Sequence, residues 1–167
     1  MMKSKVLIYP NPILKKISKK VEEKTQKIEK IINDLVNIRK HTDHSTGIAA
    51  PQIGESIRII AVDPGKNKKC KEHHGKNILI NPKILKWEGT ILSREGCMSV
   101  PDFTGNVNRA RKVIVQFLDI NFNENVIETN GFESILLQHE IDHLNGILFI
   151  DRVISKRTDL FRRNKKI

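Results

Sequence analysis

The stretch "QHEIDHLNG" at residues 138–146 constrains the fold most, because it places His139, Glu140 and His143 within five positions. Side chains four residues apart lie on one face of an α-helix, which turns once every ~3.6 residues. Two imidazoles with that spacing can bind one metal ion, with the intervening glutamate beside the metal's water. The alternative is a polar helix face with two ordinary histidines, so the rest of the chain must decide.

The first part of the chain predicts one core-packing helix followed by strands. Apolar residues recur at helical spacing from about Glu22 to His41, and lysines and glutamates cover the opposite face. Strand patterns follow at 57–63 and 78–85. Pro82 interrupts the second of these, which predicts an edge strand or a bent strand.

The second part predicts a strand over 113–118, a hairpin turn at "NFNEN", and then the helix that carries the histidines. Asn130 can cap that helix with Glu133 at the reciprocal position, and Gly146 ends it. A short strand is predicted at "ILFIDRV", followed by an exposed basic tail over about 155–167. Strands followed by a helix favour an α+β fold, and 167 residues suit one domain spanning the chain.

The net charge of +11 favours an anionic partner, and the ribosome surface is one such candidate. Abundant Lys, Ile and Asn also match a compositionally biased genome, so we expect no specific DNA recognition. No apolar run reaches about 18 residues, so no membrane contact is expected. Cys70 and Cys97 are too few for a disulfide framework, which favours a cytoplasmic protein.

A metal site on the histidine helix needs a third protein ligand, because catalytic metals usually have three such ligands and one open position. Cys70 lies in "KKCKEHH", but a highly charged loop favours an exposed thiol there. Cys97 lies in "REGCMSVP", where Gly96 allows close backbone approach to a ligand. Taken alone, Cys97 is better explained as a buried cysteine that binds nothing.

Three segments together resemble the signature segments of peptide deformylase: "GIAAPQ" at 47–52, "EGCMS" at 95–99 and "HEIDH" at 139–143. The resemblance runs from "YPNPILKKIS" to "GILFIDRV". It implies an α+β fold in which antiparallel β-sheets surround a central HExxH-bearing helix, with an N-terminal helix packed outside. It also implies that Cys97, His139 and His143 bind one divalent metal ion, usually Fe²⁺, with Zn²⁺, Ni²⁺ or Co²⁺ as alternatives.

The resemblance implies a hydrolase that removes the formyl group from N-formylmethionyl nascent peptides and releases formate. Glu140 is implied to move the water's proton, and the Gln52 amide and the Met98 N–H to stabilise the oxyanion. The implied substrate-binding residues are Thr46, Gly47, Ile48 and Gly96 along the peptide, and Phe132, Ile135 and Leu136 in the methionine pocket, on the helix face of His139. We also predict a Glu95–Arg109 ion pair that holds the Cys97 loop.

The chain departs from the family pattern at four positions. Ser45 stands where glycine is common, Ile48 and Met98 where leucine is common, and Thr104 where an arginine that helps to bind the peptide is common. Ser45 and Thr104 indicate one alternative, a deformylase-like hydrolase with altered or weak substrate preference. A second alternative is a basic ribosome- or RNA-binding protein with a structural metal site, which would have no use for Glu140. A zinc protease of the HExxH type would need a different third ligand and a long cleft.

Overall fold

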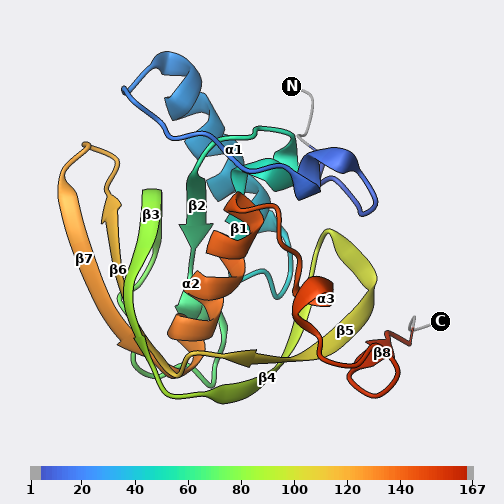
Figure 1. Ribbon diagram of the computed structural model, residues 1–167. Coiled ribbons are helices and arrows are strands. Elements are labelled where there is room, and N and C mark those ends of the chain that lie inside the picture. Colours follow the sequence, from blue (N-terminus) through green and yellow to red (C-terminus); the bar gives the residue numbers. More distant parts are fainter. Residues whose placement is uncertain (1–4, 165–167) are drawn as a thin grey trace.

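Two antiparallel sheets and a central helix make up the structure, a computed structural model that describes residues 5–164 (Figure 1). The larger sheet has the order β1-β2-β3-β6-β7 and the smaller one the order β4-β5-β8. The strands are β1 Gly47–Ala49, β2 Ile59–Val62, β3 Asn77–Glu88, β4 Ile91–Cys97, β5 Val100–Arg109, β6 Lys112–Leu118, β7 Glu124–Asn130 and β8 Leu160–Arg162. The helices are α1 Gln26–His41, α2 Gly131–Leu144 and α3 Phe149–Arg152, with short 3-10 turns at Pro12–Lys15, Ala50–Ile53 and Pro64–Lys66.

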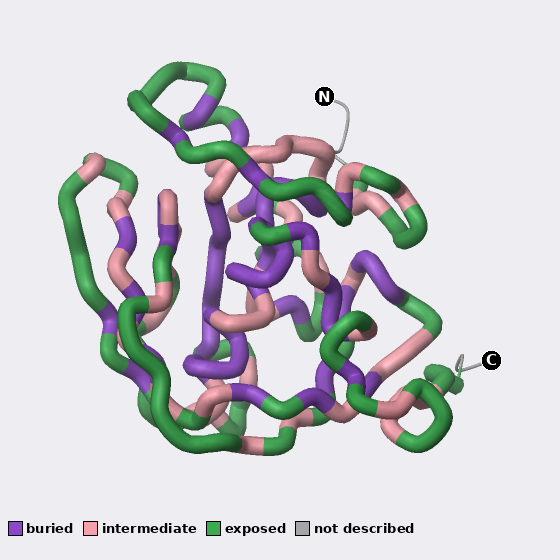
Figure 2. The backbone as a smooth tube through the Cα atoms, in the orientation of Figure 1, coloured by how far each residue is buried: buried purple, intermediate pink, exposed green. Residues whose placement is uncertain are grey.

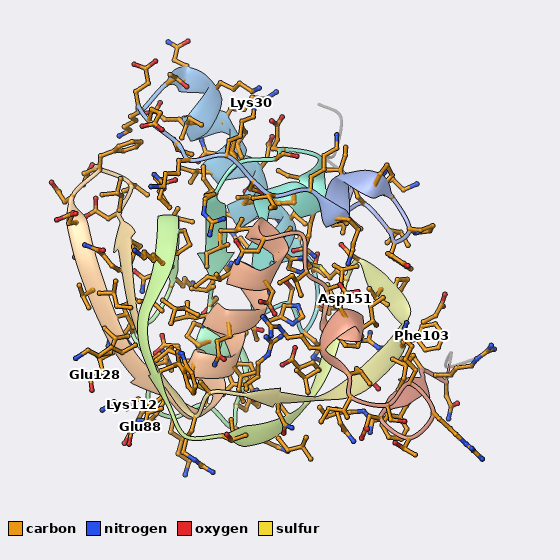
Figure 3. All side chains as sticks on the ribbon, in the orientation of Figure 1. Lys30, Glu88, Phe103, Lys112, Glu128 and Asp151 are labelled. Carbon is orange, nitrogen blue, oxygen red and sulfur yellow. The ribbon has the colours of Figure 1, made fainter. Side chains whose placement is uncertain are left out.

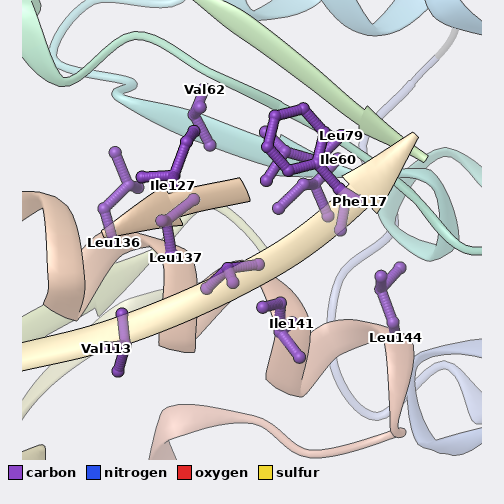
Figure 4. Packing of buried hydrophobic residues seen from close by; sticks show 12 residues of the cluster. Ile60, Val62, Leu79, Val113, Phe117, Ile127, Leu136, Leu137, Ile141 and Leu144 are labelled. Atoms are coloured by element: carbon purple, nitrogen blue, oxygen red, sulfur yellow. The ribbon is translucent and has the colours of Figure 1, made fainter. Parts of the chain in front are cut away.

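Helix α2 carries the two histidines and packs across one face of the larger sheet (Figures 1 and 4). Leu136, Leu137, Ile141 and Leu144 of α2 meet a layer of strand side chains, namely Ile60, Val62, Leu79, Val113, Val115, Phe117 and Ile127. Most of α2 is buried, as Figure 2 shows. The predicted central position of this helix is therefore confirmed, and its polar side chains are held by a rigid core.

Helix α1 covers the opposite face of the larger sheet, as expected for the N-terminal helix. Successive side chains of β2 point to opposite faces, so Ile60 and Val62 meet α2 while Ile59 and Ala61 belong to the cluster under α1. The helix begins at Gln26 rather than near Glu22. Thr25 is the reason, because its side-chain oxygen accepts a hydrogen bond from the Ile28 N–H at 3.2 Å and caps the first turn.

The C-terminal part of the chain differs from two expectations. The predicted strand at 147–153 is wrong, because Phe149–Arg152 form the helix α3. Asp151 accepts a hydrogen bond from the Leu148 N–H at 2.8 Å, which favours a helical turn over an extended strand. The segment predicted as an exposed tail includes β8, which pairs with Phe103–Gly105 of β5.

Strand β3 is bent and lies inside the larger sheet, because it pairs with both β2 and β6. Pro82 falls where the register with β6 shifts, between Ile80 and Lys83, so the predicted bend is confirmed and the edge position is wrong.

The start of α2 also differs from the prediction. Asn130 occupies the N-cap position, but its side chain makes no capping hydrogen bond. Glu133 instead accepts hydrogen bonds from the Thr129 hydroxyl at 2.6 Å and from the His74 N–H at 3.0 Å. Glu133 thereby ties the loop before β3 to α2. The predicted end of the helix is confirmed, because α2 stops at Leu144 and Gly146 has a φ of +70°.

Several charged side chains lie on the outside of the fold. Lys30 points away from the outer side of α1, and Glu88, Lys112 and Glu128 gather at one end of strands β3, β6 and β7 (Figure 3). Lys112 forms an ion pair there with Glu128. Between residues 5 and 164, no helix combines the length and apolar character needed to span a bilayer.

Candidate active site

Cys97, His139 and His143 meet where the end of β4 approaches α2. One candidate ligand atom from each residue lies within 4.8 Å of the other two, and Cys97 Sγ is 3.3 Å from His143 Nε2. In the part of the chain from residue 5 to 164, this is the one group of three or more His, Cys or acidic side chains arranged to hold a metal ion. The histidines stand one helical turn apart, and the cysteine comes from a strand of the smaller sheet.

The donors of this cluster suit a divalent metal ion. Burial raises the pKa of the Cys97 thiol, but the charges and hydrogen bonds of His143 and His139 outweigh that effect and lower the pKa well below its usual range. A thiolate with two imidazoles is a donor set used by Fe²⁺, Zn²⁺, Co²⁺ and Ni²⁺. The Nδ1 atom of His139 is hydrogen-bonded to Glu95 at 2.8 Å, so its Nε2 is the nitrogen available to a metal.

A buried ion network holds His139 in place. Both Glu95 oxygens accept from the Arg109 guanidinium, at 2.7 and 2.9 Å, so the predicted Glu95–Arg109 ion pair is confirmed. Arg109 also donates a hydrogen bond to Asp142 at 2.6 Å, and Asp142 accepts a further hydrogen bond from Arg152 at 2.7 Å. Burial raises the pKa of Glu95, but Arg109 and His139 together lower it to about 2. The carboxylate therefore stays charged and orients the imidazole.

We expect Glu95→Gln to destabilise the metal-free protein by about 3 kcal/mol, because it removes one charge of a buried, hydrogen-bonded ion pair. Urea unfolding in the presence of a chelator measures this effect without any contribution from bound metal. Glu23→Gln is the control, because Glu23 is exposed. A free energy of unfolding equal to that of the control would show that the network does not stabilise the fold.

Glu140 lies beside the cluster with a carboxylate oxygen that has no partner. It is only 3% exposed, and its Oε2 forms no hydrogen bond with any residue from 5 to 164. Burial raises the pKa of Glu140 and outweighs the opposing charges of His139 and His143. Gly47 of β1 makes room for this carboxylate, because a side chain there would collide with Glu140 Oε1 and come within 2.8 Å of Leu136.

The Gln52 amide is oriented so that its nitrogen faces the cluster. Its Oε1 accepts a hydrogen bond from the Ala49 N–H at 2.9 Å, which identifies the other amide atom as the nitrogen. That Nε2 lies 3.1 Å from Ser99 Oγ and 3.5 Å from Cys97 Sγ. Gln52 is 1% exposed, so it presents a fixed donor beside the thiolate.

A cavity of about 240 Å³ opens next to these groups. It is lined by most of the residues that the sequence indicated, namely Thr46, Gly47, Gln52, Gly96, Cys97, Met98, Phe132, Ile135, Leu136, His139 and Glu140. His143 lies beneath them and is almost fully buried. Ile48 is the exception, because its side chain is fully buried in the core under α1 and does not reach the cavity.

The structure also brings residues to the cavity that sequence reasoning missed. Asp43, His44, Arg94 and Arg163 line it, and Ser99 contacts Gln52. Arg94 directly precedes the "EGCMS" segment and Ser99 is its last residue, while Asp43 and His44 lie shortly before "GIAAPQ", so closeness to a motif was a usable signal. Arg163 carried no such signal, because it reaches the cavity only through the pairing of β8.

The second cysteine lies away from the cluster. Cys70 is half-buried, and its thiol is 3.5 Å from the Glu72 carbonyl oxygen. The neighbouring His74 is bound to Glu133, with its Nδ1 2.8 Å from the carboxylate. The loop that holds Cys70 is thus tied to α2 through His74.

Comparison with known sequences identifies relatives over nearly the whole chain. The family model described as polypeptide deformylase matches residues 3–159. A peptide deformylase of Thermodesulfovibrio yellowstonii is 40% identical over 158 residues, which cover 95% of this chain and 93% of that protein. A peptide deformylase of Halothermothrix orenii is 44% identical over 144 residues, covering 86% of this chain and 89% of that protein.

Solved structures with the same fold carry the same family name. The crystal structure of peptide deformylase from Thermotoga maritima superimposes with a TM-score of 0.83 at 29% identity, covering 93% of this chain and all of that chain. The structure of a peptide deformylase from Legionella pneumophila gives a TM-score of 0.81 at 38% identity, with 89% of this chain and 85% of that chain covered.

Proposed function

We propose that Cys97, His139 and His143 bind the divalent metal ion of a working deformylase, because this chain belongs to the peptide deformylase family. As a peptide deformylase, the protein is a metal-dependent hydrolase that removes the formyl group from N-formylmethionyl peptides. The observation that carries the metal assignment is the meeting of one sulfur and two histidine nitrogens within 4.8 Å, next to an unpartnered carboxylate.

When bound, the cation supplies a Lewis acid that lowers the pKa of a water molecule and polarises the formyl oxygen. We propose Fe²⁺ as this ion, and the same donors also suit Zn²⁺, Ni²⁺ and Co²⁺. Glu95 and Arg109 contribute by orienting His139. Glu95 is hydrogen-bonded to His139 Nδ1 and is itself held by Arg109, so the imidazole cannot rotate away from the cluster.

Glu140 is the group that moves the proton. Its free oxygen accepts a proton from the water that attacks the formyl carbon, as the new C–O bond forms. It then gives that proton to the amine nitrogen when the C–N bond breaks, so that formate and a peptide with a free amino group leave. Burial supports this role, because it raises the pKa of Glu140 toward the working pH and favours a group that both takes and returns a proton.

Gln52 and Met98 stabilise the negative charge that develops on the formyl oxygen. The amide nitrogen of Gln52 faces the cavity beside Cys97, and the Met98 N–H follows Cys97 directly in the chain. Donors fixed in this way need no rearrangement as charge develops, because Ala49 and Ser99 already hold the amide.

We expect Gln52→Leu to lower kcat by about 100-fold, because it removes one oxyanion donor while keeping a side chain of similar length. Steady-state formate release from a formyl-Met peptide measures this change at fixed metal content. Gln26→Leu is the matched control, since Gln26 is exposed at the start of α1. Native kcat in the Gln52 variant would contradict the donor role.

The substrate is held by a pocket and by backbone. Phe132, Ile135 and Leu136 form an apolar wall of the cavity on the same side of α2 as His139, which suits a methionine side chain. Thr46, Gly47 and Gly96 line the same cavity and offer backbone groups to an extended peptide, which would pair there like an added strand. The side chain of Ile48 faces the core and contributes only to the support of this strand.

Nascent chains are the proposed source of substrate, which places the protein in the cytoplasm near ribosomes. The net charge of +11 supports an approach to the ribosome surface, because ribosomal RNA is anionic. The alternative of a binding protein with a purely structural metal site is not supported, since the relatives are named as deformylases.

Formate release tests the proposed function. Metal-loaded protein is expected to release one formate for each free amino group that appears on a formyl-Met-Ala-Ser peptide. The same peptide with an acetyl group in place of formyl is the control substrate. Failure of the native, metal-loaded protein to release formate from formyl-Met peptides would refute the proposal.

A further inference from the structure

The guanidinium of Arg163 lies over Gly96 at the active-site cavity, and both residues line it. A side chain at Gly96 would collide with Arg163 Nη2 and would come within 3.2 Å of its Cζ. The backbone of Arg163 is fixed directly after β8, because its N–H donates to the Asp102 carbonyl at 2.8 Å. The C-terminal strand therefore brings the positively charged guanidinium to the place where substrate is expected.

The strand register explains this position. Thr104 of β5 lies opposite Gly96 of β4 on one side and Phe161 of β8 on the other. Side chains two residues apart share a sheet face, so Arg94 and Arg163 flank this row on the same face. Arg94 donates from Nε to Thr104 Oγ1 at 2.9 Å and lies 3.5 Å above the ring of Phe161.

Arg94 and Arg163 form an arginine rim whose charge is not neutralised. Neither side chain makes an ion pair with a carboxylate in the part of the chain from 5 to 164. The arginines that do so there are Arg39, Arg109 and Arg152. Arg94 and Arg163 are both exposed. A guanidinium with free donors binds a carboxylate through two parallel hydrogen bonds, so the rim is suited to an acidic group on the substrate.

We propose that Arg163 is a specificity-determining residue that binds a carboxylate of the peptide shortly after the formyl-methionine. The inference rests on the proposed function, because it needs a peptide that runs across Gly96 with its formyl group at the metal cluster. Such a peptide passes next to the guanidinium. Glutamate or aspartate at the second or third position is then favoured over its amide, through tighter binding rather than faster chemistry.

Two pairs of amidated formyl-Met tripeptides test the proposal, one with Glu or Gln at the second position and one with Glu or Gln at the third. Formate release gives kcat and KM for metal-loaded native protein, Arg163→Gln, Arg163→Lys and Arg162→Gln. Arg162 is the matched control, because it lies one residue earlier, opposite Phe103, and its side chain points to the other face of the sheet.

The native protein is expected to prefer Glu over Gln in at least one pair by about three- to tenfold in KM. The preference weakens as ionic strength rises, because the rim is exposed. Arg163→Gln abolishes it by raising KM for the Glu peptides, Arg163→Lys retains part of it, and Arg162→Gln retains it.

Two results would overturn the assignment: equal KM values for Glu and Gln in both pairs with native protein, or a preference that survives Arg163→Gln. If native protein released no formate from any of the four peptides, the proposed function itself would be refuted. That outcome is distinct from active protein that ignores the carboxylate.

Discussion

Replacement of Glu140 by glutamine is expected to lower kcat for formate release by about 10³- to 10⁴-fold without loss of metal. Glutamine keeps the size of the side chain but can neither accept the water's proton nor return it to the leaving amine. Metal content stays at the native level, because Glu140 is not among the three residues whose ligand atoms cluster. Steady-state kinetics together with metal analysis of the same preparation measure both quantities.

Glu124→Gln is the control for this variant, because Glu124 is exposed at the start of β7. It is expected to leave both kcat and metal content unchanged. Near-native kcat in Glu140→Gln at full metal content would show that another group moves the proton. Loss of metal would instead show that Glu140 is a ligand.

Replacement of Cys97 by alanine is expected to remove both the metal and the activity. Two imidazoles without the thiolate leave an incomplete donor set, because the cluster consists of Cys97, His139 and His143 and a catalytic metal usually needs three protein ligands. Protein purified without oxygen and analysed for metal is expected to contain about one ion per chain when native and almost none in the variant.

The other cysteine of the chain gives the matched control. Cys70→Ala is expected to keep native metal content and native formate release, because Cys70 lies in the loop before β3 and its thiol faces the Glu72 carbonyl. Retention of one tightly bound metal ion by Cys97→Ala, with loss in Cys70→Ala, would reverse the ligand assignment.

The sequence predicts which residues gather at the cavity better than it predicts the elements around them. The spacing of His139 and His143 fixes their common helix face, and the "EGCMS" segment indicates Cys97 only through resemblance to a family. Residues alone favoured an inert, buried Cys97, because nothing local shows that the end of β4 meets α2. That meeting depends on the packing of a helix against two sheets, which is a non-local property of the chain.

Helix α2 illustrates the same limit. It is buried on most sides, so its apolar residues form no single stripe from which a neighbour could be inferred. Its capping was predicted from local chemistry, but Glu133 is used by Thr129 and His74 instead. The order of the strands in the larger sheet is likewise a non-local property that could not be read from periodicity.

The C-terminal segment shows where local composition misleads. Its many basic residues favour an exposed tail, but Leu160 and Phe161 are half-buried and continue the smaller sheet as β8. Strand pairing depends on the free edge that β5 offers, which the segment's own sequence does not reveal. Because of this pairing, Arg163 reaches the cavity. The proposed preference for acidic peptides depends on that position.

We expect one cation to be held by Cys97 Sγ and the ring nitrogens of His139 and His143. Anomalous diffraction from metal-loaded crystals at the absorption edge of the bound metal tests it most directly. One strong anomalous peak is expected within about 2.5 Å of those three ligand atoms. A peak at another place, such as the loop of Cys70 and His73, with none between Cys97 and α2, would contradict it.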